Sequence, residues 1–183
     1  IPNKILHNFL FSKIKGVISS DLDYHIPLNG APKYLGLIPN PINIDALKYR
    51  QLLIGDKIII FHGINTNNAI KKGNKFFTDA LDIIKHKYRN KVDIIASEDL
   101  PYEAYMKAFE SCHILLDQVY SYDQGYNALE AMAIGKVVFT GAEEEWLEYY
   151  NVDETKVVIN ALPNTDYIVS KLEWLINNPK KII

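Results

Sequence analysis

Two stretches of this sequence carry residue types that could bind phosphate or sugar groups. The first begins at Gly125 and lies between two apolar runs, Ile114–Leu116 and Val137–Phe139. Asn127 followed three residues later by Glu130 is typical of a helix start, in which the asparagine caps an amide and the glutamate reaches back to the cap. Gly135 predicts the end of the same helix. The stretch therefore predicts a turn and a short helix between two strands.

A helix in this place would present its first amides at the carboxyl end of a buried strand. Unpaired amides and the helix dipole, about half a unit of positive charge, favour anions there. Open α/β sheets also bind ligands at that edge, so the pattern predicts a phosphate site. Glu130 could accept two hydrogen bonds from a vicinal diol such as a ribose, although a glutamate in a capping box needs no ligand to explain it.

The second stretch runs from His62 to Gly73 and follows the apolar run Ile58–Phe61. It exceeds the roughly 2 to 6 residues that usually join a strand to a helix, and long connections of this kind often bind ligands. Lys71 and Lys72 could contribute positive charge to such a site, or they could be solvated loop charges. His62, at the strand end, could donate to a sugar hydroxyl or satisfy a nearby carbonyl oxygen.

Both stretches resemble the nucleotide-binding half of a retaining glycosyltransferase of family 4, which has the GT-B fold. The resemblance rests on Gly125, the run Asn127–Ala133, Gly135, the run Val137–Gly141 and the pair Lys72-Gly73. In the family, the lysine of such a pair meets the donor diphosphate and the glycine lets the backbone come close. The resemblance implies a donor-binding set made of Gly63, Lys72, Gly73, Gly125, Tyr126, Asn127 and Glu130.

The sequence departs from the family pattern at two positions. The family carries a first glutamate, associated with the donor sugar, eight positions before the second, and Tyr122 stands there in this chain. Asp123 or Asp117 could substitute for it as a sugar contact. The family also has an arginine after the glycine that ends the first strand, whereas Ile64 stands here. One phosphate cation is therefore missing, unless Lys71 supplies it.

The activity that the resemblance implies is transfer of a sugar from a nucleoside diphosphate donor, with uridine or guanosine as the expected base. Positive side chains and helix amides would stabilise the leaving diphosphate, so neither a metal nor another cofactor is expected. The implied partners are the donor and a glycan or lipid-linked acceptor, as in polysaccharide biosynthesis. Because another domain would bind the acceptor, we expect this chain alone to be inactive, and no catalytic residue is assigned.

The composition is that of an ordinary globular protein, with 48% hydrophobic and 23% charged residues among 183. A net charge of −2 gives no reason to expect nucleic acid as a partner. Cys112 is the only cysteine, so no disulfide framework supports secretion, and the neighbouring His113 is expected to pack rather than to bind a metal. No apolar run approaches the roughly 18 residues of a membrane span. The expected location is cytoplasmic, with any membrane contact at the periphery.

The pattern divides the chain into three parts. Residues 1–38 hold apolar positions spaced like one face of a helix, followed by a short strand, and we expect them to be the tail of a preceding acceptor-side domain. Pro39-Asn-Pro41 stops regular structure, which places a linker at residues 39–55 or marks a simple exit from a strand into a loop. Residues 56–183 form the predicted donor-binding domain. Since the chain starts with Ile1 rather than methionine, we expect it to be a piece of a longer polypeptide.

In the third part, apolar runs typical of strands alternate with helical patterns. The expected strands are Ile58–Phe61, Val92–Ile95, Ile114–Leu116, Val137–Phe139 and Val157–Ile159. The expected helices lie around Phe76–Ile84 and over Tyr102–Ser111, Asn127–Ile134, Glu143–Tyr150 and Asp166–Ile176. This alternation predicts right-handed crossovers and an α/β fold with a Rossmann-like doubly wound parallel sheet. The resemblance identifies that sheet with the C-terminal half of a GT-B fold.

Two other classes of protein stay open at this point. A GT-B nucleotide-sugar epimerase would share the nucleotide pocket but not the acceptor. A non-enzymatic receiver-like signalling domain would use an aspartate that ends a strand, as Asp117 does. It would also need an acidic pair after the first strand, where His62-Gly63-Ile64 stands. The sequence therefore argues against a receiver domain and does not separate a transferase from an epimerase.

Overall fold

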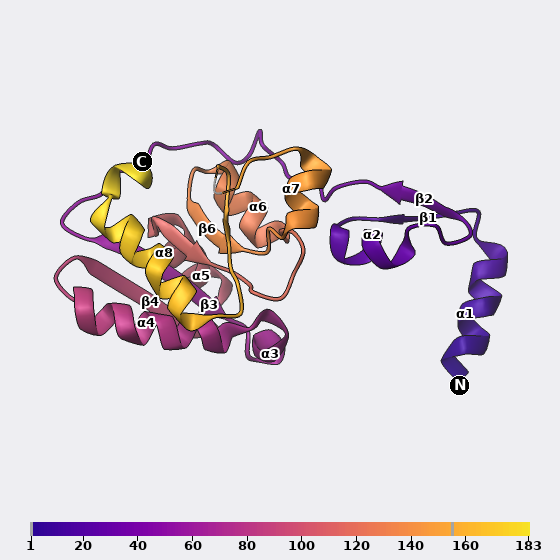
Figure 1. The fold of residues 1–183 in the computed structure, drawn as a ribbon, viewed down its shortest axis with the longest axis horizontal. Coiled ribbons are helices and arrows are strands. Elements are labelled where there is room, and N and C mark those ends of the chain that lie inside the picture. The colour runs from indigo at the N-terminus through magenta and orange to yellow at the C-terminus, as the bar shows by residue number, and fades with distance from the viewer. Residues whose placement is uncertain (1, 155) are drawn as a thin grey trace. The chain divides into compact units, whose positions relative to one another are not determined.

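The computed structural model describes residues 2–154 and 156–183 (Figure 1). The chain forms two compact units, one ending at Pro41 and the other running from Ile42 to Ile183. The division falls inside the segment 39–55, where the sequence predicts a linker. Within the described ranges, no helix is both long enough and apolar enough to cross a membrane.

The first unit consists of two helices and a short pair of parallel strands. These elements are α1 (Pro2–Lys13), β1 (Val17–Ser19), α2 (Leu22–Leu28) and β2 (Tyr34–Leu37). The helix and the strand expected near the start of the chain are therefore present. Ile5, Phe9 and Leu10, which share the predicted apolar face of α1, are each more than half exposed. The assignment of this unit to an acceptor-side domain stays a prediction.

The second unit contains a sheet of five parallel strands. These are β3 (Ile58–Ile64), β4 (Val92–Glu98), β5 (Ile114–Leu116), β6 (Val137–Thr140) and β7 (Ile159–Asn160), in the order β4-β3-β5-β6-β7. The chain passes from β3 outward to β4 and then crosses back, so that β5 lies on the other side of β3. At such a reversal of strand order, open α/β sheets form a crevice outside the carboxyl ends of the strands.

Helices cover both faces of this sheet. They are η1 (Thr66–Asn68), α3 (Ala69–Lys72), α4 (Asn74–Tyr88), α5 (Tyr102–Ser111), α6 (Tyr126–Ala133), α7 (Glu144–Tyr150), α8 (Thr165–Asn177) and η2 (Pro179–Lys181). Helices α4 and α8 lie side by side (Figure 1) and share one core cluster with Ile114 and Leu116 of β5. On the opposite face Phe61 packs against Tyr105 of α5, with ring centroids 5.1 Å apart. The predicted doubly wound parallel sheet is confirmed.

Several strand limits differ from the predicted ones because polar residues join the ladder. β3 extends beyond Phe61 to Ile64, since its last three residues pair with Ala96–Glu98 of β4. Apolarity cannot reveal this extension, because backbone groups of any residue type can complete the pairing. β7 spans only Ile159–Asn160, so the strand expected at Val157–Ile159 is wrong at its start. The long connection after β3 is also not irregular, because it contains η1 and α3.

Candidate functional site

A cavity of about 480 Å³ lies at the carboxyl ends of β3 and β4, beside the reversal of strand order. Gly63 at the end of β3 and Asp99 after β4 form part of its wall. Lys72 of α3, Tyr105 of α5 and Asn127 of α6 complete much of the rest. The structure thus brings three members of the predicted donor-binding set into one cavity. Four others do not line it, namely Gly73, Gly125, Tyr126 and Glu130.

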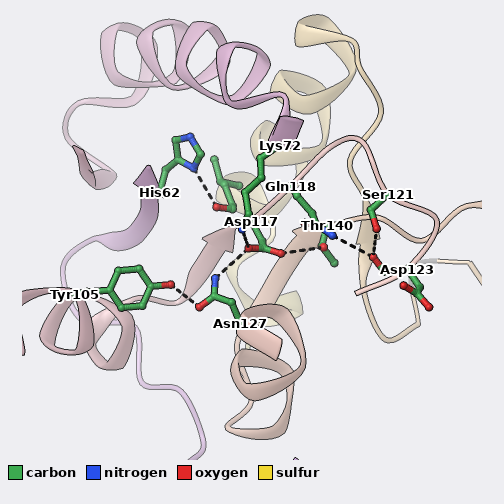
Figure 2. A network of polar contacts seen from close by, with 10 residues as sticks. His62, Lys72, Tyr105, Asp117, Gln118, Ser121, Asp123, Asn127 and Thr140 are labelled. Atoms are coloured by element: carbon green, nitrogen blue, oxygen red, sulfur yellow. Dashed lines mark hydrogen bonds and ion pairs between the residues drawn. The ribbon is translucent and has the colours of Figure 1, made fainter. Parts of the chain in front are cut away.

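Lys72 and Asp117 form an ion pair beside this cavity. Lys72 Nζ lies 2.9 Å from Oδ1 of Asp117, the residue that follows β5 (Figure 2). The Asp117 side chain is 1% exposed and that of Lys72 is 30% exposed, so the pair runs from the interior to the cavity wall. The Val119 amide also donates to the carbonyl oxygen of Lys72 at 2.8 Å. Both the backbone and the ammonium of Lys72 are therefore tied to the segment after β5.

Asn127 has a different role from the predicted cap. Helix α6 begins at Tyr126 with Gly125 as its N-cap, and no side chain caps it. Asn127 Nδ2 donates to Oδ1 of Asp117 at 3.1 Å, and Asn127 Oδ1 accepts from the hydroxyl of Tyr105 (Figure 2). The predicted capping box is therefore wrong. Asn127 is the second residue of the helix, and its side chain bonds a buried carboxylate instead of a free amide.

Glu130 lies in the second turn of α6 and is half-buried. Burial raises the pKa of the Tyr105 hydroxyl, and the charges of Asp117 and Glu130 raise it further. Glu130 thus acts electrostatically on Tyr105, a residue of the cavity wall. Since the capping box is absent, a cap no longer explains Glu130, and the ribose contact stays a prediction.

The glycines of the site have different explanations. A Cβ on Gly63 would lie 2.7 Å from the Tyr105 ring, and one on Gly73 would lie 2.9 Å from Cβ of Val119. Gly73 also has a φ of +68°, which residues with a side chain rarely adopt. At Gly125 a Cβ would meet no described atom within 4 Å, and the φ of −82° suits any residue. Packing therefore explains Gly63 and Gly73, whereas Gly125 leaves open space through which a ligand could approach the amides of α6.

Three further residues belong to the site although the sequence analysis assigns them no role in it. Tyr105 orients Asn127, as described above. Thr140 Oγ1 donates to Oδ2 of Asp117 at 3.3 Å. The carboxylate of Asp99 accepts from the amide and the hydroxyl of Thr66 at 3.1 and 2.6 Å, and these bonds lower the pKa of Asp99. Asp99 thereby joins the loops that follow β3 and β4. A polar residue at a strand end was a local signal for Thr140, which ends β6, and for Asp99, which follows β4, whereas Tyr105 had no such signal.

His62 serves the fold rather than the cavity. Its ring is fully buried, and Nδ1 lies 3.0 Å from the carbonyl oxygen of Leu116, so that the ring donates there. Burial lowers the pKa of His62, which favours the neutral ring. Of the two roles considered for this residue, the bond to a carbonyl oxygen is the one present. The sugar contact is wrong for this structure, because no part of the ring reaches the surface.

None of the three candidates for the two charged residues that this sequence lacks relative to the family pattern, Asp117, Asp123 and Lys71, lines the cavity. Asp117 is wrong as a sugar contact, because its carboxylate is buried and already accepts three hydrogen bonds. The backbone carbonyl of Asp123 accepts from Ser121 Oγ at 2.6 Å and from Gln118 Nε2 at 3.3 Å (Figure 2). Asp123 does not line the cavity, and its contact with a sugar stays a prediction. Lys71 is exposed on α3 and does not line the cavity either.

Comparison with known proteins finds likeness in structure only. No protein-family model matches the sequence, and no curated protein matches it. A mutant of S. aureus TarM, in complex with Fondaparinux, alpha-GlcNAc-glycerol and UDP, matches with a TM-score of 0.70 at 14% identity, over 93% of this chain and 38% of TarM. Anabaena HepE in complex with UDP-glucose matches with a TM-score of 0.61 at 15% identity, over 92% of this chain and 56% of HepE.

An epimerase has the same fold. A putative UDP-N-acetylglucosamine 2-epimerase from Listeria monocytogenes matches with a TM-score of 0.51 at 15% identity, over 76% of this chain and 44% of the epimerase. The chain therefore spans less than two thirds of each of these three proteins. The likenesses show that the chain has the Rossmann-like α/β architecture of GT-B proteins, as the sequence predicts.

Proposed function

We propose that this chain binds the nucleoside diphosphate sugar of a GT-B glycosyltransferase, and that the enzyme is a retaining one similar to family 4. The observation that carries the proposal is the position of Lys72, which lines the cavity at the carboxyl ends of β3 and β4, beside the reversal of strand order. An ammonium has three donors, and Asp117 is its only acceptor among the described residues. Donors therefore stay available for a diphosphate. The complexes of TarM with UDP and of HepE with UDP-glucose support this ligand class.

The chemistry requires stabilisation of the diphosphate as negative charge develops on it. Lys72 would supply a positive charge, and the first amides of α6, which are open at Gly125, would supply further donors. These groups belong to the protein, so the proposed reaction needs no metal ion. We propose a glycan or lipid-linked acceptor, held mainly by residues outside this chain, and a cytoplasmic setting. The chain alone should then bind the donor without transferring its sugar.

Calorimetric titration with nucleoside diphosphates tests the proposal. Either uridine diphosphate or guanosine diphosphate should bind more tightly than the corresponding nucleoside, because only the diphosphate meets Lys72 and the α6 amides. Equal affinity of diphosphate and nucleoside, or no binding of any of the four compounds, would contradict the proposal.

A nucleotide-sugar epimerase is the second candidate, favoured by the structural match to the Listeria epimerase. It would use the same donor cavity, so binding does not separate the two functions. The reaction product distinguishes them. The test needs a polypeptide that also contains the proposed acceptor side: incubated with UDP-N-acetylglucosamine without an acceptor, a transferase should leave the sugar unchanged, whereas an epimerase would invert one sugar carbon, which NMR would detect.

A receiver-like domain is not supported by the site. Counted from β3, the strand order is 2-1-3-4-5, which flavodoxin-like domains, receivers among them, also have. The residues differ, because no acidic pair follows β3 and the Asp117 side chain is only 1% exposed. A phospho-acceptor aspartate must reach its phosphodonor, and Asp117 does not reach the surface.

A further inference from the structure

The carboxylate of Asp117 is a point at which four elements of the second unit meet. Asp117 follows β5 directly and accepts from Lys72 of α3 at 2.9 Å, from Asn127 of α6 at 3.1 Å and from Thr140 of β6 at 3.3 Å (Figure 2). Lys72 and Asn127 line the cavity, whereas Asp117 does not. The buried charge therefore lies behind the cavity wall, in contact with two residues that form it.

Burying a carboxylate is costly, and packing alone does not explain one here. The charge must leave water, and only pairing and hydrogen bonds offset that cost. An apolar side chain of similar size would fill the same space without the cost, since buried ion pairs are often replaceable in this way. We therefore explain the charge of Asp117 by its hydrogen bonds to Lys72 and Asn127, two residues that line the cavity.

Both of these side chains lose their usual freedom through Asp117. A lysine has a long flexible stem, but Lys72 is fixed at its backbone carbonyl by the Val119 amide and at Nζ by Asp117. Asn127 is oriented by two bonds, because Tyr105 donates to Oδ1 and Nδ2 donates to Asp117. Each side chain uses one donor on Asp117 and retains at least one more.

We propose that Asp117 is a positioning residue of the donor site, which holds Lys72 and Asn127 with their remaining donors available to the diphosphate and does not itself touch the donor. This inference rests on the proposed function and adds a residue that the resemblance to family 4 does not supply. It also accounts for a site with one cation fewer than the family pattern. Lys72, the cation that is present, is fixed in one conformation by its contacts with Asp117 and Val119.

The proposal predicts a change in diphosphate affinity opposite in direction to the change expected from charge alone. The negative charge of Asp117 opposes that of a diphosphate, so removal of the charge alone would strengthen binding. Loss of positioning would weaken binding, because an unheld lysine must give up rotamer freedom to meet the ligand. Asp117→Asn keeps the shape of the side chain and removes the charge.

The experiment is calorimetric titration of the chain with uridine diphosphate, and with uridine as the matched ligand. We expect Asp117→Asn to bind uridine diphosphate at least tenfold more weakly, about 1.4 kcal/mol, and to bind uridine within twofold of the unaltered chain. We also expect Asp117→Asn to cause a smaller loss in a Lys72→Met background than in the unaltered chain, because only the part that acts through Asn127 then remains. A general structural defect would add its own loss in the double variant.

Affinity of Asp117→Asn equal to or greater than that of the unaltered chain would overturn the inference and leave the proposed function standing. If the unaltered chain binds neither uridine diphosphate nor guanosine diphosphate, both the inference and the proposed function are contradicted. If Asp117→Asn does not fold, Lys72→Arg replaces it, because arginine keeps the charge but not the geometry. A tenfold loss with Lys72→Arg supports positioning, and full affinity contradicts it.

Discussion

The amino and carboxyl edges of the five-stranded sheet both bury polar side chains, but these side chains have different partners. At the amino edge His113 accepts from the Ile59 amide at 2.8 Å and lies 3.2 Å from the carbonyl oxygen of Leu53. Lys136 Nζ donates to two carbonyl oxygens at the end of α5, with that of Glu110 at 2.7 Å. At this edge the polar side chains bond backbone amide and carbonyl groups.

At the carboxyl edge the polar side chains bond one another instead. Asp117, Lys72, Asn127 and Tyr105 form a chain of side-chain contacts that ends in a cavity wall. A cavity of about 380 Å³ also lies at the amino edge and includes His113 and Lys136. The two edges differ in what their polar side chains bond, which is backbone at the amino edge and mainly one another at the carboxyl edge.

Removal of Lys72 should have the largest effect on stability. Asp117 would then be a buried charge without its cation, and we expect Lys72→Ala to lower the free energy of unfolding by about 3 kcal/mol, the lower end of the range for broken buried pairs. The lower end applies because Lys72 is 30% exposed. Urea titration measures the loss. Addition of Asp117→Asn in the same chain should restore part of it, and no restoration would show that the buried charge is not the cause.

Removal of Lys136 should affect stability but not ligand binding. Lys136→Ala leaves two carbonyl oxygens at the end of α5 without their donor, which should lower the free energy of unfolding by about 1 to 3 kcal/mol. The affinity for uridine diphosphate, measured on the folded variant, should not change. A matching loss of affinity would show that the two edges are not functionally separate.

Two glycines at the carboxyl edge should separate ligand binding from folding. Gly125→Ala should leave the stability within about 0.5 kcal/mol, since its Cβ meets no described atom. It should nevertheless weaken uridine diphosphate binding about tenfold, or 1.4 kcal/mol. Gly73→Ala is the control and should lower stability by about 1 to 3 kcal/mol, because of its positive φ and the contact with Val119. A Gly125→Ala variant with full affinity would rule out close approach of the diphosphate to α6.

Glu130→Gln tests the ribose contact. Stability should not change, because Glu130 is not part of a cap. The affinity for uridine diphosphate should fall about tenfold, since an amide has one acceptor oxygen where a carboxylate has two. The 2′-deoxy form of the diphosphate should bind the unaltered chain more weakly and respond less to the substitution. Equal loss for both ligands would contradict a contact with the ribose hydroxyls.

Acidification should have the smallest effect, through His113 at the amino edge. Burial lowers the pKa of His113, and the Ile59 amide requires an unprotonated Nδ1. Below the ordinary pKa of about 6.5 the unfolded chain therefore binds more protons than the folded chain, and the free energy of unfolding falls as the pH drops through that window.

The fall from His113 should not exceed about 1.4 kcal/mol per pH unit, the limit for one proton. Urea titrations at about pH 7.5 and pH 5.5 measure it. His62, whose pKa burial also lowers, contributes in the same direction at the carboxyl edge. His113→Gln should therefore reduce the pH dependence without abolishing it. An unchanged slope would mean that His113 does not contribute.

The sequence by itself determined the order and type of the five strands and five long helices of the second unit, but not of η1 and α3. β5 and α5 have the predicted limits, Ile114–Leu116 and Tyr102–Ser111, because their signals are local: continuous apolarity for a buried strand, and a helical pattern of residues for α5. The end of β3 was not determined in this way. Ile64 belongs to the strand because Glu98 of β4 lies beside it, and pairing with a neighbouring strand is not a local property.

Only the tertiary structure decided the roles of the site residues. The sequence indicated Lys72, Asn127 and Asp117 separately, but predicted a cap for Asn127 and a sugar contact for Asp117. The three partners of Asp117 lie 45, 10 and 23 positions away along the chain. A hydrogen bond forms only when donor and acceptor come within about 3 Å in a suitable direction. The order of the strands and the start of α6 bring these groups together. Residue spacing along the chain does not predict these contacts.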